Sequence, residues 1–381
     1  MAILRRRRVV FVLAGEVFGG AERGALDLAA VFRDEGASVA VLALDDRPGR
    51  ARVVAAERGV SWTSISVPWS GGQVRKGRSL VEVTRALRRL RPDAIVASTN
   101  LPNVVTGLTW RATGARTAVW RQCDVNGTTR ISGRLFRRAL HATPVVVTGA
   151  EHARTWLTSG YAMDPGRVQV IPSLTRLPSA VESGPAWRAR LGIADDAFVC
   201  CMVAHLHGGK DHATLLRAWH IVASELNGVQ PTLLVAGRDA GTEAASKGLA
   251  FDLDLRDRVR FLGEVDDVAG LLDACNLAAF CSHRELFPRG ITEPMAAELP
   301  VVATDLPGTR EALGDPDPGI LVGPEDPAAL AAAILRLARD ADLRERLGGA
   351  NRAVIQDRSD GATSEVAWSR LLSRAIDRSH P

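Results

Sequence analysis

Three features are scarce or missing in this sequence, and each absence excludes a class of protein. No apolar run approaches the roughly 18–20 residues of a membrane-spanning helix. The apolar stretch after Arg8 ends at Gly15 after about six residues, which is too short for a signal-peptide core and fits a first buried strand. The five cysteines contain no C-x-x-C pair and are odd in number. We therefore expect a cytoplasmic chain with free thiols, without disulfides or zinc.

Two cofactor signatures are also missing. The predicted strand Val9–Ala14 leads into G-E-V-F-G-G, which does not have the G-x-G-x-x-G spacing of dinucleotide-binding dehydrogenases. No D-x-D metal clamp is evident, because the two matches to that bare pattern, Asp252–Asp254 and Asp315–Asp317, fall in predicted loop or helix surface. A nicotinamide-dependent oxidoreductase is therefore disfavoured, and no metal is expected.

The order of the predicted elements indicates two α/β domains. The length of 381 residues suits two or three domains, and 46% hydrophobic with 24% charged residues is typical of a soluble globular protein. Strand-like and helix-like runs alternate along the chain, which indicates doubly wound parallel sheets. Residues 172–185 are rich in proline and serine without periodicity, which is typical of a linker. We expect one domain over residues 1–176 and a second over 177–359.

Charge is distributed unevenly between these two halves. Residues 1–176 carry 27 Lys and Arg against 13 Asp and Glu, a net charge of +14, whereas the remainder has a net charge of −9. Either an arginine-rich composition places arginine on solvated faces, or the basic half attracts an anionic partner such as lipid headgroups or a phosphorylated acceptor. Nucleic acid is not expected, because the arginines are scattered and no base-stacking module is visible.

The segment Ser282–Thr304 is the part of the chain around which the C-terminal half is organised. Its two carboxylates, Glu285 and Glu293, lie eight positions apart, between a predicted strand at Leu277–Cys281 and a short buried strand at 300–304. In an open α/β sheet, the loop after a strand and the start of the next helix form the usual ligand crevice. The spacing therefore places both carboxylates at a candidate site.

The helix of this segment is expected to begin near Ile291. Free backbone amides of Gly290, Ile291 and Thr292 would then face an anion, with the helix dipole adding to the attraction. Pro294 is expected in the first turn, where a proline is tolerated.

Two glutamates at this spacing mean little by themselves, but the surrounding E-L-F-P-x-x-x-x-E-x-M-A-x-x-L-P-V-V-A-T resembles the donor-site signature of family 4 of the retaining GT-B glycosyltransferases. The resemblance implies two Rossmann-like domains facing a cleft, with a C-terminal helix at 360–381 crossing back to the first domain. It implies that Glu285 contacts hydroxyls of the transferred sugar and that Glu293 holds the ribose hydroxyls of the nucleotide. Phe287 lies in the turn between them and is expected at the donor site.

A second block, V-A-H-L-H-x-x-K-D-H, resembles the family segment in which an arginine and a lysine grip the donor diphosphate. Lys210 matches the lysine, and His205 stands at the arginine position. Histidine is cationic only near or below about pH 6.5, so the grip is expected to be weaker or pH-dependent unless an arginine of the first domain supplies the charge. Leu262, in the strand Val259–Gly263, belongs to a stretch that resembles the family segment lining the nucleotide base.

Two loops of the first domain resemble ligand-facing loops of the family. Gly19 and Gly20 open a predicted helix after the first strand, where the family's loop faces the donor phosphates. The family usually carries a histidine near the transferred sugar, but the corresponding stretch here, 119–124, contains none. Arg121, or Gln122 beside it, is expected to replace that histidine as a contact to the sugar or acceptor.

Two further stretches stand out. The segment 69–78 is glycine-rich and basic, and we expect an irregular loop with an exposed Trp69 at an acceptor or membrane edge. Glu298 replaces a glycine that the family typically has at a helix C-terminus, where a glutamate is unfavourable for a left-handed cap and for the helix dipole. It is either a local irregularity or a partner for the basic half.

The resemblance implies a retaining, metal-independent transferase that moves a sugar from a nucleotide-diphosphate sugar to an acceptor without a further cofactor. Lys210, Glu285 and Arg121 are the expected catalytic contacts, with Glu285 positioning the sugar rather than attacking it. The expected acceptor is a lipid-linked or anionic glycan, met through a peripheral contact of the basic domain with the inner membrane face. Three alternatives stay open: a small-molecule natural product as acceptor, a catalytically idle nucleotide-sugar-binding protein, and a sucrose- or trehalose-type synthase.

Overall fold

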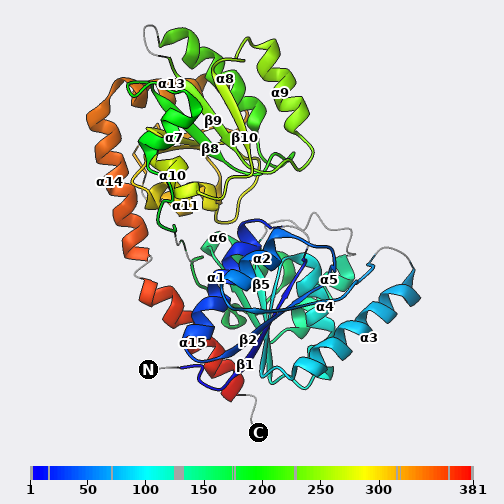
Figure 1. Cartoon of the computed structure of the whole chain (residues 1–381). Helices are drawn as coiled ribbons and strands as arrows, with labels where there is room; N and C mark the ends of the chain where they lie inside the picture. The colour runs from blue at the N-terminus through cyan, green and yellow to red at the C-terminus, as the bar shows by residue number, and fades with distance from the viewer. Residues whose placement is uncertain are drawn as a thin grey trace. The chain divides into compact units, whose positions relative to one another are not determined.

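The computed structural model describes residues 3–15, 18–69, 72–123, 133–173, 175, 177–226, 230–314, 316–317, 319–358 and 361–378. The chain divides into two compact units, Met1–Leu174 with Gly361–Pro381, and Thr175–Asp360 (Figure 1). The domain boundaries expected after residues 176 and 359 fall on residues outside the described ranges.

The first unit is built on a seven-stranded parallel sheet in the order β3-β2-β1-β4-β5-β6-β7. Its strands are β1 (Arg8–Leu13), β2 (Ser38–Ala43), β3 (Ser61–Ser64), β4 (Ala94–Ser98), β5 (Thr117–Gln122), β6 (Val145–Thr148) and β7 (Val168–Val170). Its helices are α1 (Gly20–Asp34), α2 (Arg50–Glu57), α3 (Gln73–Leu90), α4 (Asn100–Thr109), α5 (Gly133–Ala142), α6 (Glu151–Tyr161) and α15 (Gly361–Asp377).

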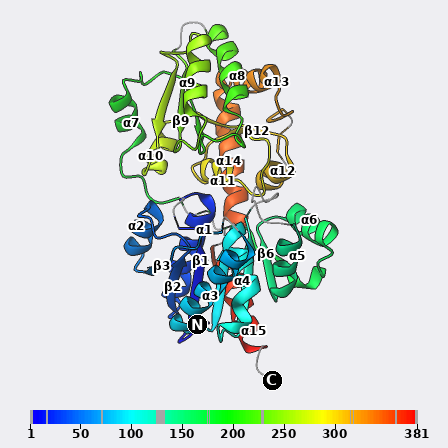
Figure 2. The ribbon, with the colours of Figure 1, turned by 90° about the vertical axis from the view of Figure 1, so that its right-hand side faces the viewer.

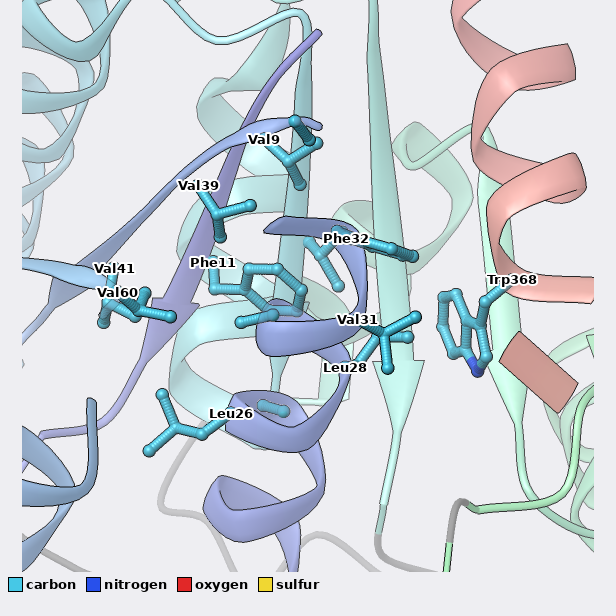
Figure 3. Packing of buried hydrophobic residues seen from close by; sticks show 14 of the residues in the cluster. Val9, Phe11, Leu26, Leu28, Val31, Phe32, Val39, Val41, Val60 and Trp368 are labelled. Atoms are coloured by element: carbon cyan, nitrogen blue, oxygen red, sulfur yellow. The ribbon is translucent and has the colours of Figure 1, made fainter. Parts of the chain in front are cut away.

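Alternate residues of β1 enter different cores, as the two-residue period of a strand requires. Val9 and Phe11 pack under α1, α2 and α15, whereas Val10 packs under α3 and α4. On the α1 side, Figure 3 shows Trp368 of α15 beside Val31 of α1, and Trp368 is only 3% exposed. The C-terminal helix thus completes a core that the first strands begin.

The segment 69–78 is not the irregular loop that the sequence suggests. α3 begins at Gln73, so the basic residues of this segment lie in a helix of 18 residues. Trp69 is half-buried and packs against two core clusters of the first unit. The prediction of an exposed tryptophan is therefore wrong. Ser70 and Gly71 lie outside the described residues.

The second unit contains a six-stranded parallel sheet in the order β10-β9-β8-β11-β12-β13. Its strands are β8 (Val199–Val203), β9 (Thr232–Ala236), β10 (Val259–Gly263), β11 (Leu277–Phe280), β12 (Val301–Thr304) and β13 (Leu321–Val322). Its helices are α7 (Gly184–Leu191), α8 (His212–Glu225), α9 (Glu243–Asp252), α10 (Val268–Asp273), α11 (Arg289–Ala296), α12 (Pro307–Leu313), α13 (Pro327–Arg339) and α14 (Ala341–Arg358).

Helices cover both faces of this sheet. α8 and α13 pack side by side over one face (Figures 1 and 2), against Cys200 and Met202 of β8. α7, α10 and α11 pack on the other face, against Cys201 and Phe280. Both units therefore have the doubly wound parallel architecture that the sequence predicts.

Asp267 ties the segment before α7 to α10. Its carboxylate accepts hydrogen bonds from the amides of Val181, Glu182 and Gly270 at 3.0–3.1 Å and from the Trp187 indole at 3.0 Å. Burial opposes ionisation of this carboxylate, but the hydrogen bonds outweigh it and hold the pKa of Asp267 down to about 2.

Replacing Asp267 with Asn should lower the free energy of unfolding by about 2 kcal/mol at pH 7. The pKa of this group falls from 3.8 to about 2 on folding, so its contribution is present above about pH 4 and is lost as the pH falls through about 2. Urea unfolding should show that the loss of unfolding free energy in the Asp267→Asn variant at pH 3 is roughly half the loss at pH 7. Asp195→Asn, at an exposed position, is the control. A deficit of the same size at both pH values would contradict this account.

Candidate functional site

Lys210 and Glu285 lie together at the carboxyl edge of the second sheet. Lys210 is in the loop after β8 and Glu285 in the loop after β11, and these two strands are neighbours. The Lys210 ammonium donates to Glu285 Oε1, and Ser282 Oγ donates to the same oxygen over 2.7 Å. The Lys210 and Glu285 side chains are 16% and 12% exposed. Two residues for which the sequence predicts separate roles thus form one largely buried ion pair.

Glu293 is also held by a cation. Arg289, four residues earlier on α11, donates from Nε to Glu293 Oε1 over 2.9 Å, and the two side chains are 11% and 7% exposed. Arg289 is not among the site residues predicted from the sequence. Arg289 and Glu293 lie four residues apart, a spacing that predicts an ion pair on a helix. The pair is predicted only if the helix includes Arg289, whereas the sequence predicts a helix that begins near Ile291.

The ring of Phe280 lies against both the Lys210 ammonium and Gly290 at the start of α11. The Lys210 ammonium lies 4.5 Å from the ring centroid, within cation–π range. On α11, Gly290 packs so closely that a Cβ there would lie 2.4 Å from the ring and 2.8 Å from the Val203 carbonyl oxygen. Only glycine fits this contact, which brings the start of α11 against the end of β8.

The amides at the start of α11 differ from the prediction. The N–H groups of Ile291 and Thr292 donate to the Pro288 carbonyl over 3.1 and 3.2 Å, so they are not free to meet an anion. Both side chains are fully buried. Pro294 lies inside the helix rather than in its first turn, and its missing N–H removes the bond to the Gly290 carbonyl.

The remaining predicted residues of the second unit are all partly buried. Leu262 and Phe287 are half-buried and pack against the same core cluster as Ile291. His205 is half-buried in the loop that leads to Lys210. His212, at the start of α8, is 3% exposed, and burial lowers its pKa to about 4. His212 is therefore neutral at pH 7 and supplies no second cation.

Glu298 follows the C-terminus of α11 and adopts a left-handed conformation with φ of 61°. Its carboxylate pairs with Arg352 of α14 over 3.1 Å, and Asn351 of α14 donates to the Leu299 carbonyl over 2.8 Å. The partner of Glu298 therefore lies in its own unit, not in the basic first unit. α14 fixes the end of the helix that carries Glu293.

A cavity of about 540 Å³ also lies in the second unit, at the C-terminal end of α11. Its lining includes Ala296, Ala297 and Arg352, and none of the predicted site residues borders it. It is therefore separate from the two ion pairs.

In the first unit, the structure brings Arg121 to the start of α1. The Arg121 guanidinium donates from Nη1 to the Ala21 carbonyl over 2.9 Å and to Ser98 Oγ over 3.4 Å, and the residue is 8% exposed. The amide of Gly19 donates to Glu22 Oε2 over 3.1 Å, so a carboxylate already occupies that donor at the helix start. Gly20 is the first residue of α1. Gln122 accepts from the Trp120 indole, and Asp124 lies outside the described residues.

The described residues lack two features, a metal-binding cluster and a membrane-spanning helix. No group of three or more His, Cys, Asp or Glu side chains in those ranges is arranged to hold a metal ion. Asp315, part of one D-x-D match, lies outside them. Among the helices that the structure describes, none is both long and apolar enough to cross a bilayer.

Two family models match this chain. The model for glycosyl transferases group 1 matches residues 184–354, and the model for Glycosyltransferase Family 4 matches residues 18–174. A phosphatidyl-myo-inositol mannosyltransferase of Mycobacterium leprae is 29% identical over 350 residues, covering 90% of this chain and 89% of that protein. A D-inositol 3-phosphate glycosyltransferase of Thermomonospora curvata is 33% identical over 251 residues, which cover 62% of this chain but only 56% of that relative.

Solved structures share the fold at lower identity. Anabaena HepE in complex with UDP and glucose superposes with a TM-score of 0.83 at 21% identity, covering 97% of this chain and 100% of that one. WaaG, a glycosyltransferase involved in lipopolysaccharide biosynthesis, superposes with a TM-score of 0.73 at 19% identity, covering 96% and 99%. These neighbours have the GT-B fold, as the sequence predicts.

Replacing Gly290 with Ala should destabilise the second unit by about 1–3 kcal/mol, because the added methyl group overlaps the Phe280 ring and a backbone carbonyl. Gly208→Ala is the matched control, since that glycine lies in the Lys210 loop and a Cβ there meets nothing within 4 Å. Urea unfolding of both variants measures the difference. Equal stability of the two variants would show that the close packing of α11 on Phe280 is not required.

Proposed function

Because the chain belongs to glycosyltransferase family 4, the glycosyl transferases group 1, we propose that it transfers a sugar from a nucleoside-diphosphate sugar to an acceptor. The observation that carries this proposal is the pair of buried carboxylates at one sheet edge, Glu285 with Lys210 and Glu293 with Arg289. Ionised carboxylates accept hydrogen bonds from neighbouring hydroxyls, and a lysine ammonium is a compact charge for phosphate. These groups support the binding of a nucleotide sugar at this edge of the sheet.

In this proposal, Glu285 positions the transferred sugar and does not attack it. Its Oε1 already accepts hydrogen bonds from Lys210 and Ser282, and both contacts reduce the nucleophilicity of a carboxylate. Lys210 stabilises the charge that develops on the leaving diphosphate, without a metal. The leaving phosphate takes the proton of the acceptor on the same face of the sugar, so the configuration is retained.

The first unit offers a surface for an anionic or lipid-linked acceptor. α3 exposes Arg75, Arg78 and Arg85, and the same helix exposes Val74 at 81% and Val81 at 49%. Exposed arginines interleaved with exposed apolar residues are typical of a helix that contacts an anionic membrane surface. The relatives named for phosphatidyl-myo-inositol and inositol 3-phosphate support an acceptor that carries phosphate.

One observation favours a second candidate, a nucleotide-sugar-binding protein without transfer activity. His205 stands where the family has an arginine, and the nearby His212 is neutral at pH 7 and cannot replace that cation. Donor binding without transfer to any acceptor would support this alternative.

Donor binding is tested by a thermal-shift panel of UDP-, GDP-, ADP- and TDP-sugars. A ligand at about 100 times its dissociation constant should add roughly 2.7 kcal/mol of stability to the wild type. Lys210→Ala and Glu293→Ala should lose this gain, because each removes a proposed ligand contact. Lys247→Ala and Glu345→Ala remove one exposed charge each from the same unit and should keep it.

Each variant is compared with its own ligand-free melting temperature, because Lys210→Ala leaves Glu285 buried without its cation and lowers stability by itself. Stabilisation of the wild type by no donor would contradict the proposed function.

Membrane contact is tested by sedimentation with anionic and neutral vesicles. The wild type should prefer the anionic vesicles, and Arg75→Gln with Arg78→Gln should weaken that preference, at roughly 1 kcal/mol for each charge near the surface. The control removes two exposed arginines of the second unit, Arg217→Gln with Arg346→Gln. Equal sedimentation of the wild type with both vesicle types would rule out this surface.

A further inference from the structure

We propose that Arg289 is a positioning residue that holds Glu293 toward the ribose hydroxyls and so sets the preference of the site for ribonucleotides over 2′-deoxyribonucleotides. The inference rests on the proposed function, because it requires a nucleotide at this edge of the sheet. Arg289 would not touch the nucleotide itself and would act only by holding the Glu293 carboxylate.

The first argument is the direction of the ion pair on α11. Arg289 is the first residue of the helix and Glu293 follows four positions later. A cation at a helix N-terminus opposes the helix dipole, and an i,i+4 pair with the cation first is less favourable than the reverse order. The first turn of α11 contains no acidic residue. The pair is therefore not explained by helix stability, although it is almost fully buried.

The second argument is the burial of Glu293. The residue is 5% exposed, and a carboxylate so far from water needs a cation and hydrogen bonds to remain charged in one orientation. The contact from Arg289 Nε to Oε1 at 2.9 Å fixes the rotation of the carboxylate. A carboxylate has about four acceptor positions, so holding one oxygen orients the remaining ones.

The third argument is the rigidity of the backbone on either side of Arg289. Pro288 restricts the chain before it, and Gly290 after it packs against Phe280 and the Val203 carbonyl. At the other end of the helix, Arg352 and Asn351 of α14 hold the chain at Glu298 and Leu299. The Arg289–Glu293 contact is thus made between side chains whose backbone positions are fixed, as precise orientation of a ligand group requires.

The test compares affinities for UDP, GDP and ADP with those for dUDP, dGDP and dADP by isothermal titration calorimetry. A hydrogen bond to a charged acceptor corresponds to a roughly ten- to hundredfold preference, so the wild type should prefer its ribonucleotide by about that factor. Arg289→Gln should reduce the preference to about threefold or less, as should Glu293→Gln. Arg284→Gln, an exposed arginine five residues earlier in the same segment, should keep the wild-type ratio.

The ratio separates positioning from a structural role, because general loss of stability weakens both nucleotides equally. Arg289→Lys keeps the charge beside Glu293 and loses the planar guanidinium, so it remains folded if Arg289→Gln does not, and its ratio should lie between those of the wild type and Glu293→Gln. An unchanged ratio in any folded Arg289 variant overturns the inference. If the wild type binds neither these six nucleotides nor TDP, the proposed function itself is wrong and the inference falls with it.

Discussion

The burial of two carboxylates is the physical constraint on which the candidate site of the second unit depends. Glu285 and Glu293 are both largely buried, and an unpaired buried carboxylate costs several kcal/mol. Each therefore requires a cation close by. Lys210 reaches Glu285 because β8 and β11 are neighbours, and Arg289 reaches Glu293 along one helix turn. The strand order and the start of α11 thus supply each buried carboxylate with the cation that it requires.

The fold could be predicted from the sequence wherever burial leaves a continuous apolar run. β1, β11 and β12 are such strands, and their positions are predicted within a few residues. β3 (Ser61–Ser64) is not, because this edge strand is only partly buried and has no apolar run. The start of α3 is also hard to predict, because the glycines and basic residues around residue 77 are typical of a loop.

Lys210, Glu285 and Glu293 could be singled out from the sequence, but Arg289 and the contacts among the four residues could not. The spacing of Glu285 and Glu293 was visible in the sequence, but the pairing of Glu285 with Lys210 joins residues 75 positions apart and depends on strand order. Arg121 shows a second limit. Its residue type suggests a ligand contact, whereas its position at the end of β5 directs the guanidinium to the Ala21 carbonyl at the start of α1. Sequence alone does not distinguish an arginine that contacts a ligand from one that donates to the backbone.

The packing of α15 has a consequence for the order in which the chain folds. Trp368, Leu372 and Ile376 belong to the core formed by β1, β2 and α1, yet the ribosome synthesises them after the whole of the second unit. All of Thr175–Asp360 is made in between, which takes roughly 10–40 seconds at the usual rate of translation. The part of α1 around Val31 that packs beside Trp368 therefore lacks this cover during that interval. The second unit can complete its own core first, although its residues come later in the sequence than β1.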